Sequence, residues 1–243
     1  MSDVRSETAH RGSPRAGAKI GEVSVSDLVT AVRRGLAVRA DAAAAPVMQR
    51  YMKSALPFRG VGKPGRVDLL RELRPLLANA DVVLAAADAL WDGAEFREEG
   101  YLGIALSRTL APEPVRLRTY RHWIVTGAWW DYVDEIASHL VGPTLRAVPA
   151  EVTPIIRSWA SDPDRWVRRT SIICQLGSKD RTDTELLAAA IEASSTDSDF
   201  FLRKGIGWAL RQHAHTDPGW VSAFLANHPE LSPLSRREAS KHL

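Results

Sequence analysis

From about Ser24 to the C-terminus, apolar residues recur with the period of an α-helix, and short groups of Gly, Pro, Asp or Ser separate the periodic stretches. No stretch shows the two-residue alternation and hairpin turns that are typical of a β-sheet. The predicted helices are short, amphipathic and closely connected, which indicates an all-α protein and favours an α-solenoid. An irregular helical bundle fits the pattern as well, because no repeat is readable as identical residues. The predicted helices cover residues 25–38, 41–55, 66–77, 80–91, 94–109, 113–125, 131–146, 150–160, 164–177, 183–194, 198–213, 217–227 and 234–242.

The composition narrows the class of protein only in part. The 243 residues carry a net charge of +3, and 26 of the 32 basic residues are Arg, which pairs with phosphate in a planar fork and stacks on rings. A GC-rich genome also favours Arg codons, so this preference does not name a partner. Cys174 is the only cysteine, which excludes an intramolecular disulfide and indicates a reduced core thiol.

No targeting or membrane segment is predicted. No apolar run approaches the roughly 18 residues that span a bilayer. The segment from Met1 to Lys19 is polar and has no hydrophobic signal region. We therefore expect a cytoplasmic protein in which residues 1–22 form a disordered extension and residues 23–243 form one domain.

The helix predicted from residue 131 carries the first unusual position. If the helix is extended back by one turn, Trp129 lies in the middle of its apolar face, and Trp130 and Asp134 lie at its boundary with solvent. Asp131 points to the opposite side. An N-cap at Asp131 and an acidic first-turn residue at Asp134 explain the same spacing. The apolar face itself is formed by Val133, Ile136, Ala137 and Leu140.

Arg169 is the second unusual position, because it shares a helical face with Ile172, Ile173 and Leu176. A charge at a buried position needs a partner, since an unpaired buried charge is costly. The partner is either an internal carboxylate or, in a cleft, a DNA phosphate. Escape of the side chain off the end of the helix is a further alternative.

The third unusual position is the helix around Trp208. Gly205 shares a face with Trp208, and Gly205 and Gly207 each cost about 1 kcal/mol relative to Ala inside a helix. Lys204 and Arg211 flank Trp208, so this face predicts either a stacking wall for a ligand or a tightly packed helix–helix contact.

One loop, Pro57-Phe58-Arg59-Gly60-Val61-Gly62-Lys63-Pro64-Gly65-Arg66, combines three cations with three glycines. Its backbone N–H groups and its side chains are expected to meet phosphates together. The loop lacks the spacing of a P-loop, and no strand precedes it, which excludes nucleotide binding of that type.

Taken in order, these segments resemble the AlkD family of bacterial DNA alkylation repair proteins. The resemblance runs from about residue 45 to the C-terminus, and the longer N-terminus departs from it. The matching pieces are Tyr51-Met52-Lys53 with Pro57-Phe58-Arg59-Gly60, Leu90-Trp91-Asp92 with Arg97-Glu98, Trp129 to Asp134, Trp166-Val167-Arg168-Arg169, Lys204-Gly205-Ile206-Gly207-Trp208, and Pro233-Leu234-Ser235-Arg236-Arg237-Glu238-Ala239.

The resemblance implies an α-solenoid of HEAT-like repeats with a concave basic face for duplex DNA. It implies excision of N3- and N7-alkylated purines, recognised through the backbone, with Asp134 as the catalytic carboxylate. Trp130 and Trp208 are then the aromatic walls, and Arg169 is the arginine that holds a flanking phosphate. The remaining residues expected to contact DNA are Tyr51, Lys53, Arg59, Lys63, Arg66, Lys204 and Arg211.

A lone carboxylate suffices for this chemistry, because an alkylated purine is cationic and leaves without protonation. The sugar then gains oxocarbenium character, which a carboxylate stabilises. We expect a monomer without metal or other cofactor, partnered by alkylated double-stranded DNA, and a monofunctional enzyme without lyase activity. His213 and His215 are expected at the surface. A non-catalytic HEAT-like module that binds DNA structures or a protein partner, or a purely structural scaffold, shares the same helical pattern.

Overall fold

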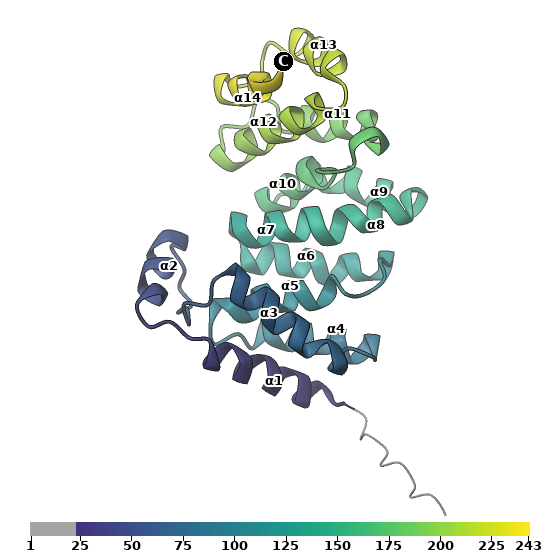
Figure 1. Cartoon of the computed structure of the whole chain (residues 1–243). Coiled ribbons are helices and arrows are strands. Elements are labelled where there is room, and N and C mark those ends of the chain that lie inside the picture. The colour runs from purple at the N-terminus through teal and green to yellow at the C-terminus, as the bar shows by residue number, and fades with distance from the viewer. Residues whose placement is uncertain (1–22) are drawn as a thin grey trace, which may run out of the picture.

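The computed structural model describes residues 23–243, and over this range the chain is helical throughout (Figure 1). The extension predicted for residues 1–22 lies outside the described residues. Short 3-10 turns follow α3, precede α6, precede α11 and end the chain. The α-helices are α1 (Val25–Val38), α2 (Ala44–Met52), α3 (Lys63–Leu73), α4 (Ala80–Asp92), α5 (Arg97–Ser107), α6 (Leu117–Gly127), α7 (Trp130–Ile136), α8 (Gly142–Ala147), α9 (Pro149–Trp159), α10 (Arg165–Ile173), α11 (Thr184–Glu192), α12 (Phe200–Ala214), α13 (Pro218–Asn227) and α14 (Pro233–Ala239).

The helices stack in chain order, with α1 at one end of the stack and α13 and α14 at the other (Figure 1). This arrangement confirms the predicted α-solenoid. Each layer covers the apolar side of its neighbours, so the buried side chains run through the stack from Leu28 of α1 to Ala239 of α14. Helix α2 stands apart at the side of the stack and has no buried residue.

Aspartates fix the start of several helices and reveal a repeat. Asp164 accepts hydrogen bonds from two backbone N–H groups at the start of α10, and Asp199 does the same at the start of α12. Asp162 and Asp197 lie two residues before these caps and accept the N–H of Asp164 and of Asp199. The interval between the two motifs is the same 35 residues that separate Asp134 from Arg169. Identical residues therefore do mark the repeat at this place, although the sequence pattern was expected to show none.

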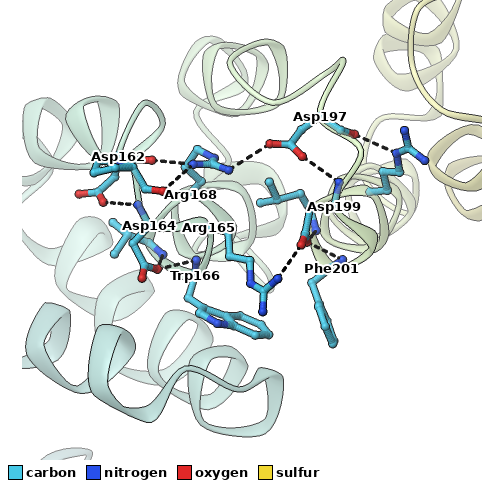
Figure 2. Close-up of polar contacts among 12 residues, drawn as sticks. Asp162, Asp164, Arg165, Trp166, Arg168, Asp197, Asp199 and Phe201 are labelled. Carbon is cyan, nitrogen blue, oxygen red and sulfur yellow. Dashed lines mark hydrogen bonds and ion pairs between the residues drawn. The ribbon is translucent and has the colours of Figure 1, made fainter.

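Arginines join the two motifs across the repeats (Figure 2). Arg168 of α10 donates to the Asp197 carboxylate at 3.0 Å, and Arg165 donates to the Asp199 carboxylate at 3.0 Å. These four residues are called the inter-repeat ladder below. They tie the start of α12 to α10, so the ladder fixes how α12 is placed above the preceding layers.

A π-helical turn, 137–141, joins α7 to α8. Pro143 has no N–H to donate to the carbonyl of His139, so the regular α-helical bond cannot form at this place. Gly142 packs against α10 so closely that a Cβ atom would lie 2.2 Å from the carbonyl oxygen of Cys174. The turn brings Ser138 and His139 to the wall of a cleft that is described below.

Two expectations about single residues have different outcomes. Cys174 is buried as predicted, and burial raises the pKa of its thiol to about 12. His213 was expected at the surface, and this prediction was wrong. Its side chain is buried against the ring of Trp220, because it lies on the same face of α12 as the buried Leu210 and Ile206.

Among residues 23–243, no helix is long and apolar enough to cross a membrane.

Candidate active site

A cleft of about 870 Å³ opens beside α3, α5, α7 and α12. Five of the residues predicted for function line it: Lys63, Arg66, Trp130, Asp134 and Trp208. They come from three helices that are far apart in the sequence, and the stacking of the solenoid brings them together. The cleft is also lined by polar residues to which the sequence analysis assigned no role, among them Tyr101, Arg108, Glu135, Ser138 and His139.

Asp134 is bound to Arg169 by two parallel hydrogen bonds. Arg169 Nε donates to Asp134 Oδ1 and Arg169 Nη2 donates to Asp134 Oδ2, each at 2.8 Å. Arg169 Nη1 donates to the backbone carbonyl of Phe201 on α12. The buried Arg169 is therefore paired with an internal carboxylate, which is one of the alternatives given for it in the sequence analysis. Arginine is suited to this place because its planar fork matches a carboxylate in two contacts.

The side chain of Asp134 is mostly buried but keeps some contact with solvent. Its side chain keeps 16% of its surface accessible, whereas that of Arg169 keeps 6%. Burial raises the pKa of the Asp134 carboxyl above its usual range, and the hydrogen bonds from Arg169 oppose that rise. The accessible part of the carboxylate faces the cleft, so a ligand there would meet a carboxylate whose orientation is already fixed.

The two tryptophans of the segment lie in different surroundings. Trp130 lines the cleft, whereas Trp129 packs against the rings of Trp166 and Phe201 at centroid distances of 6.2 and 5.5 Å. Trp208 lines the cleft from α12. The cleft therefore has one aromatic side chain beside Asp134 on α7 and another on α12, which lies beyond α10 in the stack.

The prediction for Asp131 was wrong. Helix α7 begins at Trp130 without a side-chain cap, and Asp131 is buried instead of facing solvent. Its carboxylate accepts hydrogen bonds from Arg97 Nη2 at 2.6 Å and Arg97 Nε at 3.2 Å, and also from the Tyr101 hydroxyl. The helical pattern could not anticipate this, because Arg97 reaches Asp131 from a neighbouring helix that the periodicity of α7 does not describe.

Two cations of α3 reach the cleft with different surroundings. The Arg66 guanidinium lies 4.2 Å above the ring of Tyr101, and its Nη1 donates to the carbonyl of Val61 at 2.7 Å. The Lys63 ammonium is largely exposed and lies 3.2 Å from the carboxylate of Glu135. Both side chains can reach an anion in the cleft, and Arg66 is the more firmly oriented of the two.

The loop of residues 57–66 binds an internal anion. The backbone N–H groups of Arg59, Gly60 and Val61 all donate to the carboxylate of Glu98, at 2.9 to 3.1 Å. Glu98 is fully buried, so these N–H groups do not face a phosphate, contrary to the prediction for the loop backbone. The turn requires glycine at residue 60, which has a φ of +84° and no room for a Cβ atom. The Arg59 guanidinium lies 3.7 Å above the ring of Phe96.

The two cations beside Trp208 share one partner. Glu238 of α14 lies 3.1 Å from Lys204 and also pairs with Arg211. Gly207 packs against α14, where a Cβ atom would lie 2.5 Å from Glu238 Cβ, whereas a Cβ atom on Gly205 would lie 3.0 Å from Arg169 Nη1 of α10. Both glycines therefore lie at close contacts between helices, and the stacking wall for a ligand stays a prediction.

The remaining predicted residues lie away from the cleft wall. Tyr51 and Lys53 are exposed at the end of α2, with Tyr51 keeping 72% of its surface accessible. Met52, which lies between them, does line the cleft. The structure therefore places α2 at the rim, although it does not bring Tyr51 or Lys53 to Asp134.

Glu135, Arg108 and His139 are the main site residues that the sequence analysis did not single out. Lys63, Arg108 and His139 surround its carboxylate at 3.2, 3.6 and 3.5 Å. Burial and the nearby Arg108 lower the pKa of His139. The i, i+4 spacing of Glu135 and His139 was the one available signal, and it could not reveal the two other cations.

No group of three His, Cys, Asp or Glu side chains able to hold a metal occurs within residues 23–243.

Comparisons with known proteins give this arrangement a context. The family model for DNA alkylation repair enzymes matches residues 32–243. The solved structure of a predicted DNA alkylation repair enzyme from Enterococcus faecalis is similar to this chain, with a TM-score of 0.77 and 29% sequence identity. That similarity covers 84% of this chain and 97% of the other. The comparison with curated proteins finds no match.

Proposed function

Because this chain belongs to the family of DNA alkylation repair enzymes, we propose that it is a DNA glycosylase for cationic N3- and N7-alkylated purines in duplex DNA, such as 3-methyladenine and 7-methylguanine. The observation that carries the proposal is the Asp134 carboxylate, which lies in an open cleft and is oriented by Arg169. A buried ion pair is weak evidence for stability, because desolvation offsets much of the attraction. Its position in a cleft that is also lined by Trp130 and Trp208 supports a role in chemistry.

The proposed reaction needs a carboxylate but no general acid, because the cationic purine leaves without being protonated. The bond between the sugar C1′ and the purine nitrogen breaks, and its electron pair neutralises the cationic base. The sugar is left with oxocarbenium character, which the negative charge of Asp134 stabilises. Water then adds to C1′ and gives up a proton, which leaves an abasic site. Asp134 is also placed to accept a hydrogen bond from that water.

Arg169 acts as a positioning residue in this proposal. It holds both carboxylate oxygens, and its hydrogen bonds favour the ionised form of Asp134 against the effect of burial. The bonds to Asp134 and Phe201 use three of the five N–H donors of the guanidinium. The side chain of Arg169 is only 6% accessible, so contact with the flanking phosphate that the resemblance implies requires its remaining donors to become exposed.

The aromatic and basic residues would hold the nucleotide. Trp130 and Trp208 present π-faces, which attract a cationic base or a cationic sugar. Lys63 and Arg66 reach the cleft from α3 and are proposed to contact phosphates on a basic face. The further phosphate contacts proposed from the sequence are Tyr51, Lys53, Arg59, Lys204 and Arg211; of these, Lys204 and Arg211 must leave Glu238 to make such contacts.

Asp134→Asn tests the proposal, because it removes the charge and keeps the shape of the side chain. Release of 7-methylguanine from methylated duplex DNA should fall by at least about 10²-fold, in line with the loss of one electrostatic contact in a transition state. Binding of unmodified duplex should change little. The matched control is Asp68→Asn, on an exposed part of α3 outside the cleft lining. Normal base release by Asp134→Asn would contradict the assigned role.

The two finer parts of the proposal have separate tests. A monofunctional enzyme should give no covalent adduct with abasic DNA under borohydride reduction, and a trapped adduct at Lys63 would instead indicate lyase chemistry. A non-catalytic DNA-binding solenoid would bind duplex in a salt-dependent manner and would release no alkylated base at all.

A further inference from the structure

Glu135 lies in the cleft beside Asp134 and gathers cations from separate parts of the chain. Its Oε1 lies 3.2 Å from Lys63 Nζ at the start of α3. Its Oε2 lies 3.6 Å from Arg108 Nη1, directly after α5, and 3.5 Å from His139 Nε2 in the π-helical turn. All four residues line the cleft. Three nitrogen groups thus converge on the place where one carboxylate now lies.

The ion pairs around Glu135 are exposed enough that a phosphate could replace the carboxylate. The accessible fractions of the side chains are 69% for Lys63, 43% for Arg108, 41% for His139 and 32% for Glu135. Ion pairs with such exposure contribute about 0 to 1 kcal/mol, so the loss of the Glu135 contacts costs little. The pair of Asp134 with Arg169 differs in this respect, because it is bidentate, shorter and mostly buried.

The charges also argue against a cluster that serves only to neutralise Glu135. Lys63 and Arg108 carry two positive charges against the single negative charge of Glu135, and His139 adds a further N–H donor or acceptor. A carboxylate at the wall of a cleft for DNA repels phosphate unless it can be moved. Carboxylate and phosphate oxygens accept hydrogen bonds from the same groups, so either can occupy the centre of this cluster.

We propose that Lys63, Arg108 and His139 form a binding site for one backbone phosphate of the DNA, and that Glu135 occupies this site in the free protein. The inference rests on the proposed function, since it requires DNA in the cleft. It adds Arg108 and His139 to the residues that bind DNA, and it makes Glu135 a residue that competes with DNA. The proximity of Glu135 to Asp134 in α7 places the phosphate near the nucleotide that reacts.

The salt dependence of binding gives the first test. Full-length protein and Arg108→Gln protein are titrated with unmodified duplex DNA over a range of salt concentrations. The slope of log K against log salt should fall in magnitude by about 0.9 in the variant, the value for one lost phosphate contact. Arg71→Gln is the matched control, because Arg71 is an exposed arginine of α3 outside the cleft lining and its loss changes the net charge equally. Its slope should stay close to that of the unchanged protein.

A double-mutant cycle gives the second test. Glu135→Gln should tighten DNA binding several-fold, because the competitor has lost its charge. In the Glu135→Gln background, Arg108→Gln should still lower the slope by about 0.9. If Arg108 serves only to neutralise Glu135, then its substitution has no effect once Glu135 is neutral, and that outcome would overturn the inference.

The failure of this inference can be told apart from failure of the proposed function. Unchanged slopes in the variants, together with normal release of alkylated base, would remove the phosphate site and leave the glycosylase intact. Absence of salt-dependent DNA binding by the unchanged protein would overturn both. Lower slopes without base release would support the site and contradict the catalytic role.

Discussion

Asp131 and Asp134 leave the same turn of α7 and pair with arginines of different layers. Asp131 binds Arg97 of α5 in the preceding layer, and Asp134 binds Arg169 of α10 in the following layer. The first pair is buried on both sides, whereas the carboxylate of the second keeps its access to the cleft. The two aspartates thus fix α7 in the stack from both sides. Both line the cleft, and the carboxylate of Asp134 is the more accessible of the two, at 16% against 6%.

This difference predicts that Asp131→Asn reduces stability. The substitution removes the charge that compensates the buried Arg97 guanidinium, and breaking a buried pair in this way costs about 3 kcal/mol. Thermal or urea unfolding measures the loss. Asp92→Asn, at an exposed residue that pairs with His122, is the control and should change stability by less than about 0.5 kcal/mol. An unchanged midpoint for Asp131→Asn would show that Arg97 finds another partner.

The pH dependence of base release should depend on Arg169. Burial raises the pKa of Asp134, and the Arg169 hydrogen bonds oppose the rise, so Arg169→Gln should raise this pKa further. In the proposed mechanism base release needs the ionised carboxylate, so the acid limb of the pH–rate profile should move to higher pH in the variant. Single-turnover rates measured across pH give the midpoint. Arg168→Gln, in the inter-repeat ladder, is the control; an equal shift in both variants would contradict a specific effect of Arg169 on Asp134.

The raised pKa of Asp134 also has a consequence for stability. A carboxyl whose pKa is higher in the folded state than in the unfolded chain makes a contribution to stability that is fully present below its ordinary pKa, here 3.8. That contribution is lost as the pH rises through the pKa of the folded state. The ionised Asp134 that the proposed mechanism needs at neutral pH is therefore unfavourable for folding, and the stability of the protein comes from other residues.

Glu98→Gln should destabilise the loop of residues 57–66. The carboxylate accepts three backbone N–H groups, and an amide offers fewer acceptor sites and adds donors that have no partner there. We expect a loss of about 2 kcal/mol, consistent with buried donors left unsatisfied. Amide hydrogen exchange of the loop and thermal unfolding measure the effect. Glu72→Gln, at an exposed carboxylate on α3, should leave both unchanged.

The two glycines of α12 should respond differently to alanine. At Gly207 the added Cβ atom meets Glu238 Cβ and the Ser235 carbonyl of α14, so the helices must separate at a cost of about 1 to 3 kcal/mol. At Gly205 the closest atom to the added Cβ is Arg169 Nη1 at 3.0 Å, and Ile173 Cγ2 and Arg169 Cγ follow at ordinary contact distances of 3.5 and 3.7 Å. Gly205→Ala should therefore cost less stability than Gly207→Ala and should lower base release, because the guanidinium must shift relative to Asp134. Equal stability losses in both variants would contradict this distinction.

Helical periodicity predicted the fold well, because each helix carries its own apolar face and its own end signals. Asp164 and Asp199 are examples of caps that lie where the sequence ended one helix and began the next. Periodicity also placed Trp130 and Asp134 at the edge of the core. It could not identify Arg97 as the partner of Asp131 or Arg169 as that of Asp134, because a single helix carries no information about which side chains the next layer presents.

The same limit applies to the cations of the cleft. Lys63 and Arg66 were predicted from a local cluster of cations and glycines, whereas Arg108 stands alone in the sequence. Only the stacking of α3, α5 and α7 brings Arg108 and Lys63 to one carboxylate. Local sequence patterns therefore do not reveal a site that forms between repeats, even when each contributing helix is predicted correctly.

The 35-residue interval between Asp134 and Arg169 corresponds to one structural unit of the solenoid. In a solenoid each unit contacts only its neighbours, so units can be added or removed without refolding the others. One additional unit inserted between α9 and α10 would leave the inter-repeat ladder intact and would move Arg169 one layer away from Asp134. The protein should still fold, and the proposed base release should be lost, because the pairing of Asp134 with Arg169 depends on which layers are adjacent and not on how many there are.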